Sequence, residues 1–212
     1  MKNIAIYGFG GHGREVACLL KHINDQSPTW KLVGFFDDGE AVGKSNRYGK
    51  VLGGIDSLNN YNEPISIHIA IADIKSRLQI VNQISNENVE FPNIIAPNVL
   101  FFDQTAIRLG KGNLINFNCL IGFDVQIGDF NLLNGGIVIG HDTTLGSYNT
   151  LMPSTQISGN CSVGEYNFFG LKSMTIQGIK VGDNTRIGAG SLISHNTQDG
   201  HFYFGNPAKR MT

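Results

Sequence analysis

The chain lacks three features that would place it in other classes of protein: an excess of charge of one sign, a long apolar run, and a signal peptide. Sixteen Lys and Arg stand against seventeen Asp and Glu, a net charge of −1 over 212 residues, so no basic surface indicates binding to nucleic acid or to an anionic membrane. No apolar run approaches the ~18 residues of a transmembrane helix. Residues 1–8 lack the long apolar core of a signal peptide. We therefore expect a cytoplasmic protein that binds neither nucleic acid nor membrane.

Cysteine is also scarce. The three cysteines are Cys18, Cys119 and Cys161, a number that fits reduced surroundings rather than a disulfide framework. Because free cysteine is often buried, we interpret all three as packing residues.

What the chain does contain is a period of six. From residue 109 to 193 every sixth residue is apolar except Thr175, in the series Leu109, Ile115, Ile121, Ile127, Leu133, Ile139, Leu145, Leu151, Ile157, Val163, Phe169, Thr175, Val181, Ile187 and Ile193. This period fits neither the 3.6 of an α-helix nor the two-residue alternation of a strand. It is the hexapeptide signature of a parallel β-helix. Three six-residue walls make a coil of 18 residues, so 109–193 predicts fewer than five coils.

A second register supports this prediction. The residues four places after each repeat start are mostly small or β-branched, for example Asn131, Thr143 and Ser173. Little volume remains near the corners of a narrow prism, which favours such side chains there.

Residues 1–95 predict a small α/β domain, half of a Rossmann fold. Apolar strands are expected at 4–7, 30–36 and 65–71, and amphipathic helices at 14–24 and 75–86. Strands that alternate with helices indicate a parallel sheet. We therefore divide the chain into an α/β domain, 1–95, and a β-helix domain with a C-terminal tail, 96–212.

The turn after the first strand carries glycines at positions 8, 10 and 13, which match the dinucleotide fingerprint. Such glycines let a phosphate approach the backbone and the N-terminus of the next helix. Asp37 and Asp38 follow the second strand, where an acidic residue usually meets a ribose. Because half of a Rossmann fold is too small for NAD, a mononucleotide or nucleotide-sugar fits better; the alternative is a tight turn without a ligand.

In the repeats, His141 lies two places after Ile139 and so outside the inward register. An imidazole titrates near neutral pH and suits a general base. Asp142 would orient it if the chain turns there, since neighbours on a straight strand point to opposite faces. Gly159 lies one coil later, about 5 Å above His141, and its N–H is a candidate oxyanion donor. The alternatives are a solvated histidine and a glycine that only turns a corner.

A zinc site, which some hexapeptide prisms have, needs three converging histidines. Only His141 lies in the middle of the repeats, whereas His195 and His201 lie at or beyond their end. We therefore expect no metal.

Several motifs together resemble the bacterial sugar O/N-acyltransferases of the left-handed β-helix type. They are the turn at Gly10-Gly11-His12-Gly13, the Asp37-Asp38 pair, the hexapeptide repeats with His141-Asp142, and the ending Gly205-Asn206-Pro207-Ala208-Lys209. The resemblance covers essentially the whole chain. It implies acetyl transfer from acetyl-CoA, as a co-substrate rather than a bound cofactor, to sialic acid or a UDP-linked 4-amino-sugar, by a homotrimer that binds acetyl-CoA between subunits.

The resemblance also assigns residues. It implies His141 as base, Asp142 as the carboxylate that raises the base's proton affinity, and Asn134 near the sugar amine. The implied nucleotide-sugar contacts are Gly10, Gly11, His12, Asp37, Asp38, Ala72 and Asp73. The implied coenzyme A contacts are Leu171 and Ala189, together with Thr150, which stands where some relatives have a histidine. Lys209 and Arg210 either meet the coenzyme A phosphates or belong to a solvated tail.

The leading hypothesis is therefore N-acetylation of the 4-amino group of a nucleotide-linked sugar by direct attack on the thioester. The alternatives are a sialic-acid O-acetyltransferase and a non-catalytic trimeric scaffold that binds a nucleotide-sugar. The His141-Asp142 pair argues against a scaffold, which needs no such pair. An NAD-dependent oxidoreductase would need the missing second half of the Rossmann fold.

Overall fold

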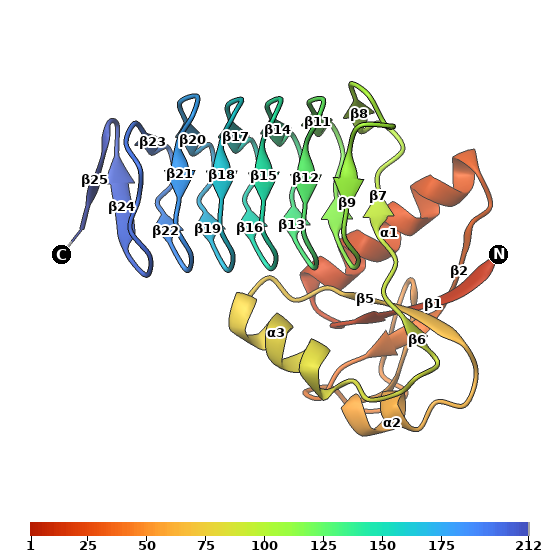
Figure 1. Cartoon of the computed structure of the whole chain (residues 1–212). Helices are drawn as coiled ribbons and strands as arrows, with labels where there is room; N and C mark the ends of the chain where they lie inside the picture. Colours follow the sequence, from red (N-terminus) through yellow and green to blue (C-terminus); the bar gives the residue numbers. More distant parts are fainter. Residues whose placement is uncertain (212) are drawn as a thin grey trace. The chain divides into compact units, whose positions relative to one another are not determined.

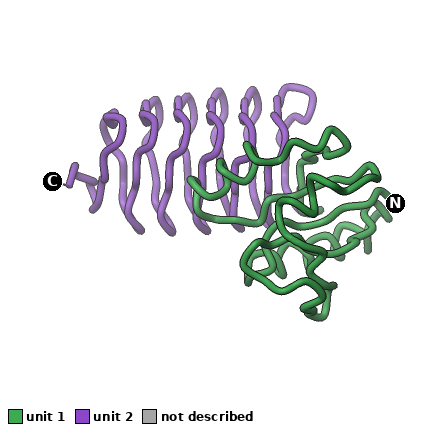
Figure 2. The backbone as a smooth tube through the Cα atoms, turned by 90° about the horizontal axis from the view of Figure 1, so that it is seen from below, with its two compact units in different colours: residues 1–97 green, residues 98–212 purple. Residues whose placement is uncertain are grey.

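The computed structural model describes residues 1–211 and divides into two compact units, Met1–Pro97 and the chain from Asn98 onward (Figure 2). No helix within residues 1–211 combines the length and the apolar character needed to cross a membrane.

The first unit is built on a six-stranded sheet of order β3-β4-β2-β1-β5-β6 (Figure 1). Its strands are β1 (Lys2–Tyr7), β2 (Trp30–Phe36), β3 (Ser45–Asn46), β4 (Gly49–Gly53), β5 (Ile65–Ile69) and β6 (Val89–Glu90). All pairings are parallel except the short β3–β4 hairpin. The three expected strands and the parallel sheet are confirmed, whereas the hairpin and β6 were not predicted.

Three helices accompany this sheet: α1 (Gly11–Gln26), α2 (Ile55–Asn59) and α3 (Ile74–Gln83). One buried cluster joins Tyr7, Phe36 and Ile67 to α2 and α3. The prediction that α1 begins at residue 14 was wrong, because Gly11, His12 and Gly13 already form its first turn. Low helix propensity conceals this start in the sequence, since glycine disfavours helix in isolation.

The second unit is a parallel β-helix with three walls of two-residue strands, stacked coil upon coil (Figure 1). The sheet of the first wall begins with β7 (Ile94–Ile95), which falls within residues 1–97. It continues with β10 (Leu114–Ile115), β13 (Leu132–Leu133), β16 (Thr150–Leu151), β19 (Phe168–Phe169), β22 (Arg186–Ile187), β24 (Phe202–Gly205) and β25 (Ala208–Arg210). The second contains β8 (Leu100–Phe101), β11 (Leu120–Ile121), β14 (Val138–Ile139), β17 (Gln156–Ile157), β20 (Met174–Thr175) and β23 (Leu192–Ile193). The third contains β9 (Arg108–Leu109), β12 (Gln126–Ile127), β15 (Thr144–Leu145), β18 (Ser162–Val163) and β21 (Lys180–Val181).

The hexapeptide register fixes the core of this unit. Within the regular repeats each stacked pair joins residues 18 apart, as in Ile121 with Ile139 and Leu133 with Leu151, whereas the spacing is 20 between β8 and β11 and 16 between β22 and β24. From Ile115 onward every residue of the apolar series is buried. The predicted β-helix is confirmed. The stack is longer than predicted, because β7 and β24 extend the first wall beyond both ends of the 109–193 series.

Corners between walls depend on one backbone conformation. At the corner after the second wall, Asp124, Asp142 and Asn160 have φ of 52°, 55° and 54°. Asn, Asp and glycine tolerate this left-handed region best. Because each coil repeats the same turn, side chains at equivalent corner positions stack directly above one another.

Part of the second register serves hydrogen bonding rather than small volume. Asn113, Asn131, Asn149 and Asn167 are fully or almost fully buried. The Oδ1 of each accepts the backbone N–H of the residue one coil later, at 2.6–2.9 Å. This ladder supplies partners for polar groups that would otherwise be costly to bury.

The predicted C-terminal tail is instead a hairpin. Strand β25 pairs antiparallel with β24 and closes the end of the first wall. Arg210 donates a hydrogen bond to the Gln198 side chain at 2.8 Å. The Arg210 side chain is therefore bound within the protein, whereas the sequence suggested a solvated tail or a contact with coenzyme A.

Candidate functional site

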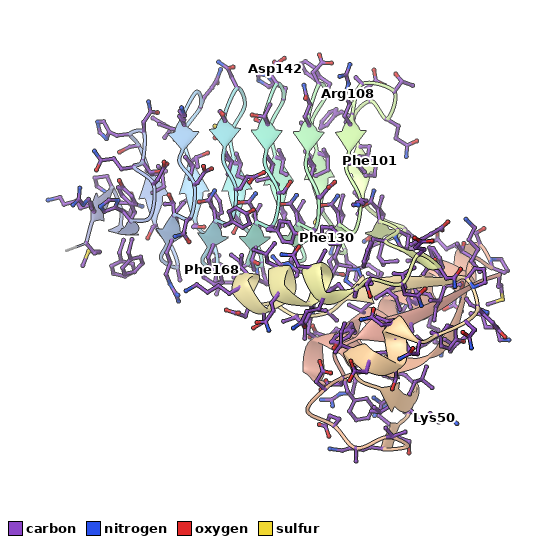
Figure 3. All side chains as sticks on the ribbon, turned by 60° about the horizontal axis from the view of Figure 1, so that its bottom comes forward. Lys50, Phe101, Arg108, Phe130, Asp142 and Phe168 are labelled. Carbon is purple, nitrogen blue, oxygen red and sulfur yellow. The ribbon has the colours of Figure 1, made fainter. Side chains whose placement is uncertain are left out.

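His141 and Asp142 meet at the corner between the second and third walls. The left-handed φ of Asp142 turns the chain, so both side chains project outward, and Figure 3 shows Asp142 at the edge of the stack. His141 Nδ1 lies 2.7 Å from the Asp142 Oδ2. A carboxylate only accepts, so Nδ1 carries the proton and Nε2 presents a lone pair. The two side chains are 44% and 51% exposed, which leaves that lone pair accessible.

Gly159 occupies the equivalent corner position one coil later. A Cβ built on Gly159 would lie 2.6 Å from His141 Nε2 and 2.8 Å from its Cε1. The imidazole therefore extends into space that only glycine leaves open. The N–H of Gly159 donates no hydrogen bond to any residue of the described chain. It is therefore available as the oxyanion donor that the sequence predicts.

Asn134, Leu171 and Ala189 line a different corner, between the first and second walls. Asn134 directly follows β13, and its Nδ2 donates to the Leu151 carbonyl at 3.0 Å. Leu171 lies at the corner after β19 and is 46% exposed. Asn134 lies at the corner before β14 and His141 at the corner after it, so a strand of the second wall separates them. One chain therefore does not bring the expected acceptor and donor contacts to its own His141.

Thr150 does not fit its expected role. It belongs to β16 and is fully buried, so it has no surface for coenzyme A. A contact of Thr150 with coenzyme A, expected from its position nine residues after His141, stays a prediction that this burial does not favour.

In the first unit, the N-terminus of α1 is open. Nothing lies within 4 Å of a Cβ built on Gly10, whereas one on Gly13 would lie 1.9 Å from the Gly8 carbonyl oxygen. Gly13 therefore permits close packing of helix and strand, and Gly10 leaves room beside the helix start. Gly10, the N-cap, contributes no side-chain hydrogen bond, and an uncapped N-terminus favours an anion.

Asp37 and Asp38 are already engaged within the protein. Asp37 accepts from the backbone N–H of Phe9 at 2.8 Å and of Gly39 at 2.9 Å. Asp38 accepts the Tyr7 hydroxyl and, at 2.8 Å, the Ile55 N–H. Both carboxylates hold the loops around the sheet edge, which is a structural role that the sequence did not predict.

Asp73 and His12 also have local partners. Asp73 is the N-cap of α3 and accepts from the Ser76 N–H and hydroxyl at 2.8 Å; these bonds lower the pKa of its carboxyl. Ala72 directly precedes this cap. His12 lies 3.4 Å from Glu15 through Nδ1, and burial lowers the pKa of its imidazole despite that carboxylate.

A hollow of about 490 Å³ adjoins the glycine turn and was not predicted. Its lining residues are Gly11, Arg14, Glu15, Cys18, Asn46, Arg47 and Tyr48. Arg14 and Arg47 make no ion pair within residues 1–211. The only sequence signal would have been two arginines flanking the predicted turn and second strand, which is too common to single them out.

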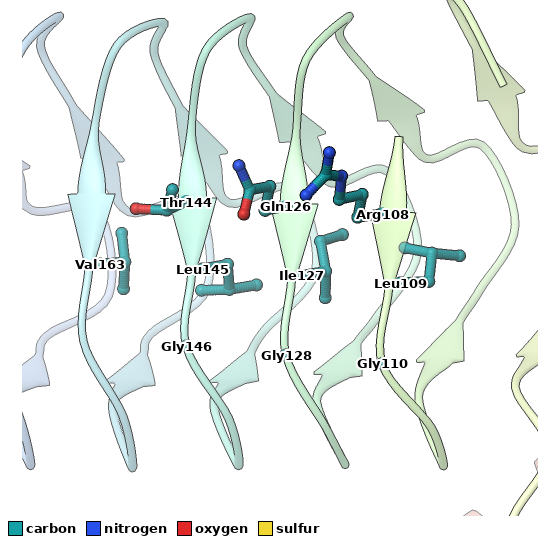
Figure 4. A pocket seen from close by; sticks show the side chains of 10 residues that line it. All are labelled: Arg108, Leu109, Gly110, Gln126, Ile127, Gly128, Thr144, Leu145, Gly146 and Val163. Atoms are coloured by element: carbon teal, nitrogen blue, oxygen red, sulfur yellow. The ribbon is translucent and has the colours of Figure 1, made fainter. Parts of the chain in front are cut away.

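A second hollow, of about 410 Å³, lies along the third wall (Figure 4). It runs over β9, β12 and β15, where glycines 110, 128 and 146 follow the strands. Thr144 lines it and stands two residues after Asp142, but neither His141 nor Asp142 is among its lining residues.

Within residues 1–211, no three His, Cys, Asp or Glu side chains come together as metal ligands would. Burial raises the pKa of the Cys119 thiol to about 11, so this thiol is unsuited to nucleophilic work.

Comparison with known proteins finds similarity for both units. Residues 3–84 match the PglD N-terminal domain. Among curated protein sequences, none matches the chain. The acetyltransferase domain of PglB from Neisseria gonorrhoeae superposes with a TM-score of 0.89 at 26% identity, covering 100% of both chains. PerB from Caulobacter crescentus, in complex with CoA and GDP-perosamine, gives 0.89 at 27% identity over 100% of this chain and 98% of PerB. WeeI from Acinetobacter baumannii superposes with a TM-score of 0.88 at 24% identity over 100% of both chains. At this identity the match shows a common fold alone.

The PglD-type domain, the walls of hexapeptide repeats and the full-length likeness to PglB and PerB agree with the resemblance drawn from the sequence. Over its whole length the chain is thus similar to bacterial sugar acyltransferases of the left-handed β-helix, hexapeptide-repeat type.

Proposed function

We propose that this acyltransferase moves an acetyl group from acetyl-CoA to the amino group of a nucleotide-linked amino-sugar. The observation that carries the proposal is the His141 imidazole, which Asp142 holds through Nδ1 while Nε2 stands beside Gly159. The likeness to a PglB domain solved with acetyl coenzyme A, and to PerB solved with CoA and GDP-perosamine, supports the donor and the acceptor class.

In the proposed reaction the neutral sugar amine attacks the thioester carbonyl carbon, and His141 Nε2 takes the amine proton as the C–N bond forms. Asp142 stabilises the resulting imidazolium across the 2.7 Å hydrogen bond. The Gly159 N–H donates to the oxyanion. The C–S bond then breaks, and the coenzyme A thiolate leaves and takes up a proton. Direct attack needs no acetyl-enzyme.

The nucleotide part of the acceptor would bind to the first unit. Gly10 and Gly11 leave open space beside the start of α1, and the neighbouring hollow presents the unpaired Arg14 and Arg47. Guanidinium groups and free helix N–H groups suit a diphosphate. Because Asp37 and Asp38 are occupied by loop N–H groups and Tyr7, the arginines are the better candidates for the charged contacts.

We also propose that the site is shared between copies in a trimer. The His141 corner and the Asn134 corner lie at opposite ends of the second wall, so acceptor, donor and base come together only if one copy's His141 corner meets another's Asn134 corner. Light scattering should give three chains per particle. A monomer at micromolar concentration would contradict the shared site.

A thiol-release assay tests the function. The purified protein receives acetyl-CoA with amino-sugars linked to UDP, GDP or dTDP, with CMP-linked and free sialic acid, or with free amino-sugars. UDP is the carrier expected from the sequence, and GDP is the carrier in the PerB complex. Release with one nucleotide-linked amino-sugar, and not with its free sugar, supports the proposal. Release only with sialic acid would redirect it to O-acetylation, and no release with any acceptor would refute it.

A further inference from the structure

The His141 ring is confined on two sides by residues one coil before and one coil after it. Phe123 stands 18 residues earlier, and its ring centroid lies 5.3 Å from that of His141 with only 11° between the planes. Gly159 stands 18 residues later and leaves room for the imidazole tip. The 5.3 Å separation is close to the spacing of stacked strands, about 4.8 Å.

This stack follows from the backbone. Asp124 and Asp142 share the left-handed φ, at 52° and 55°, so the residue before each leaves the corner in the same direction. Asp142 N–H donates to the Phe123 carbonyl at 3.1 Å, and Asn160 N–H donates to that of His141 at 2.7 Å. These hydrogen bonds join the backbone of the three corners, so the Phe123 and His141 side chains start from equivalent backbone positions one coil apart.

The hydrogen bond from Asp142 does not by itself fix the ring plane. It restrains Nδ1 at one edge of the imidazole, while both side chains stand about half exposed at the surface. A flat aromatic surface on one face removes the remaining rotation, since an imidazole that turned out of the stack would lose its contact with Phe123. Phe123 is itself 46% exposed, and burying part of its ring against His141 favours the stacked arrangement.

Within residues 1–211, the ring contact that Phe123 makes is the one with His141. Phe123 is partly exposed and does not belong to the buried core, so packing of the core does not account for its position.

We propose that Phe123 is a positioning residue for the acetyl transfer, which it serves by holding the His141 imidazole parallel to its own ring with Nε2 toward Gly159. The inference rests on the proposed function and adds to it a residue that touches neither substrate. An imidazolium over an aromatic face within about 6 Å is also attracted to it, so Phe123 supports the charged form that His141 takes when it accepts the amine proton.

The test compares Phe123→Leu with Phe123→Tyr. Leucine keeps an apolar side chain but loses the flat ring, so kcat should fall by roughly ten- to a hundredfold, the effect of a misplaced catalytic group. KM for both substrates should stay within about twofold, because Phe123 binds neither. Tyrosine keeps the ring and should retain most of kcat.

The matched control is Tyr148→Leu. Tyr148 lies at the corner after that of His141 and stacks both on Phe130, at 5.2 Å and 22°, and on Tyr166, at 5.6 Å and 21°. This variant loses two such stacks away from the His141 corner, and its kcat should stay within about twofold. An equal loss of kcat in the control would mean that stacking only stabilises the coils, and would overturn the proposal.

NMR gives a readout independent of activity. In the wild type the ring current of Phe123 should shift the His141 ring protons upfield, and Phe123→Leu should remove that shift; the His141→Gln spectrum assigns the signals. Absence of the shift, or an unchanged kcat in Phe123→Leu, overturns the inference while leaving the proposed function intact. Wild-type protein without transferase activity on any acceptor would remove both.

Discussion

The tip of the His141 imidazole occupies the place where a Cβ on residue 159 would stand, 2.6 Å from Nε2. Real Cβ atoms essentially never come that close to another heavy atom. Gly159 is therefore a condition for the observed position of the histidine, as well as a source of a free N–H.

Gly159→Ala should consequently displace His141 and reduce kcat by about tenfold or more. The nearest atoms to the added methyl belong to the flexible His141 side chain, so the unfolding midpoint in urea should change little. The control introduces Gly159→Ala into a His141→Ala background, where no clash remains and stability should be equal with either residue at 159. Undiminished kcat in Gly159→Ala would show that the histidine position does not matter.

Asp142→Asn should have a smaller effect than loss of the histidine. The amide can still accept from Nδ1, which keeps the ring oriented, but it carries no charge to stabilise the imidazolium. We expect kcat to fall by roughly tenfold and Asp142→Ala to fall further, with KM values retained. Stopped-flow or steady-state rates at saturating substrates measure this, and an Asp142→Ala enzyme as fast as the wild type would exclude the pair from the mechanism.

Arg14→Gln and Arg47→Gln should raise KM for the nucleotide-linked sugar by roughly tenfold each, since each removes one charge-assisted contact to the diphosphate. KM for acetyl-CoA should not change. Lys50→Gln removes an exposed cation of the same unit that does not line the hollow, and it should leave both constants unchanged. If all three variants weaken binding of the nucleotide-linked sugar equally, the effect comes from the overall charge of the unit. That outcome would contradict a binding site at the hollow.

The burial of His68 leads us to expect that the stability of the first unit depends on pH. Its ring is almost fully buried on β5, with neither nitrogen hydrogen-bonded within the described residues, and burial lowers the pKa of the imidazole to about 3. The unfolded chain binds this proton near pH 6.5, so the contribution to stability is full above 6.5 and is lost as pH falls from 6.5 towards 3, by up to about 1.4 kcal/mol per pH unit.

Chemical unfolding at pH 7 and pH 5 tests this for the wild type and His68→Leu. The leucine variant should be at least as stable at pH 7, because it removes unsatisfied polar atoms. Between pH 7 and pH 5 it should lose about 1–2 kcal/mol less than the wild type. Parallel losses in the two proteins would mean that His68 titrates normally in the fold.

Much of the β-helix follows from the sequence because its period is strict. The series from Ile115 to Ile193 faces inward throughout, and the positions outside it include the His141 corner. The meeting of His141 with Asp142 was predicted only on condition that the chain turns there, and the left-handed φ of Asp142 supplies the turn. Stacking of Phe123 on His141 follows from the same 18-residue period. This spacing between the two residues is the sequence signal that could have predicted the contact.

Short elements that depend on tertiary contacts were predicted less well. The two-residue strands of the β3–β4 hairpin are too short for a periodic signal, and the start of α1 at Gly11 runs against propensity. Asp37 and Asp38 stand where a nucleotide-binding fold places its acidic residues, yet backbone N–H groups and Tyr7 occupy them. A pattern of residue types does not reveal which partner a carboxylate will find.

The most direct test of the account is kcat of His141→Ala with saturating acetyl-CoA and the nucleotide-linked amino-sugar that the wild type accepts. A general base contributes typically 10²–10⁴-fold, so kcat should fall by that factor while both substrates still bind in calorimetry, and mass spectrometry should find no acetylated enzyme in either protein. Wild-type kcat in His141→Ala, or an acetyl adduct that forms and decays during turnover, would contradict it.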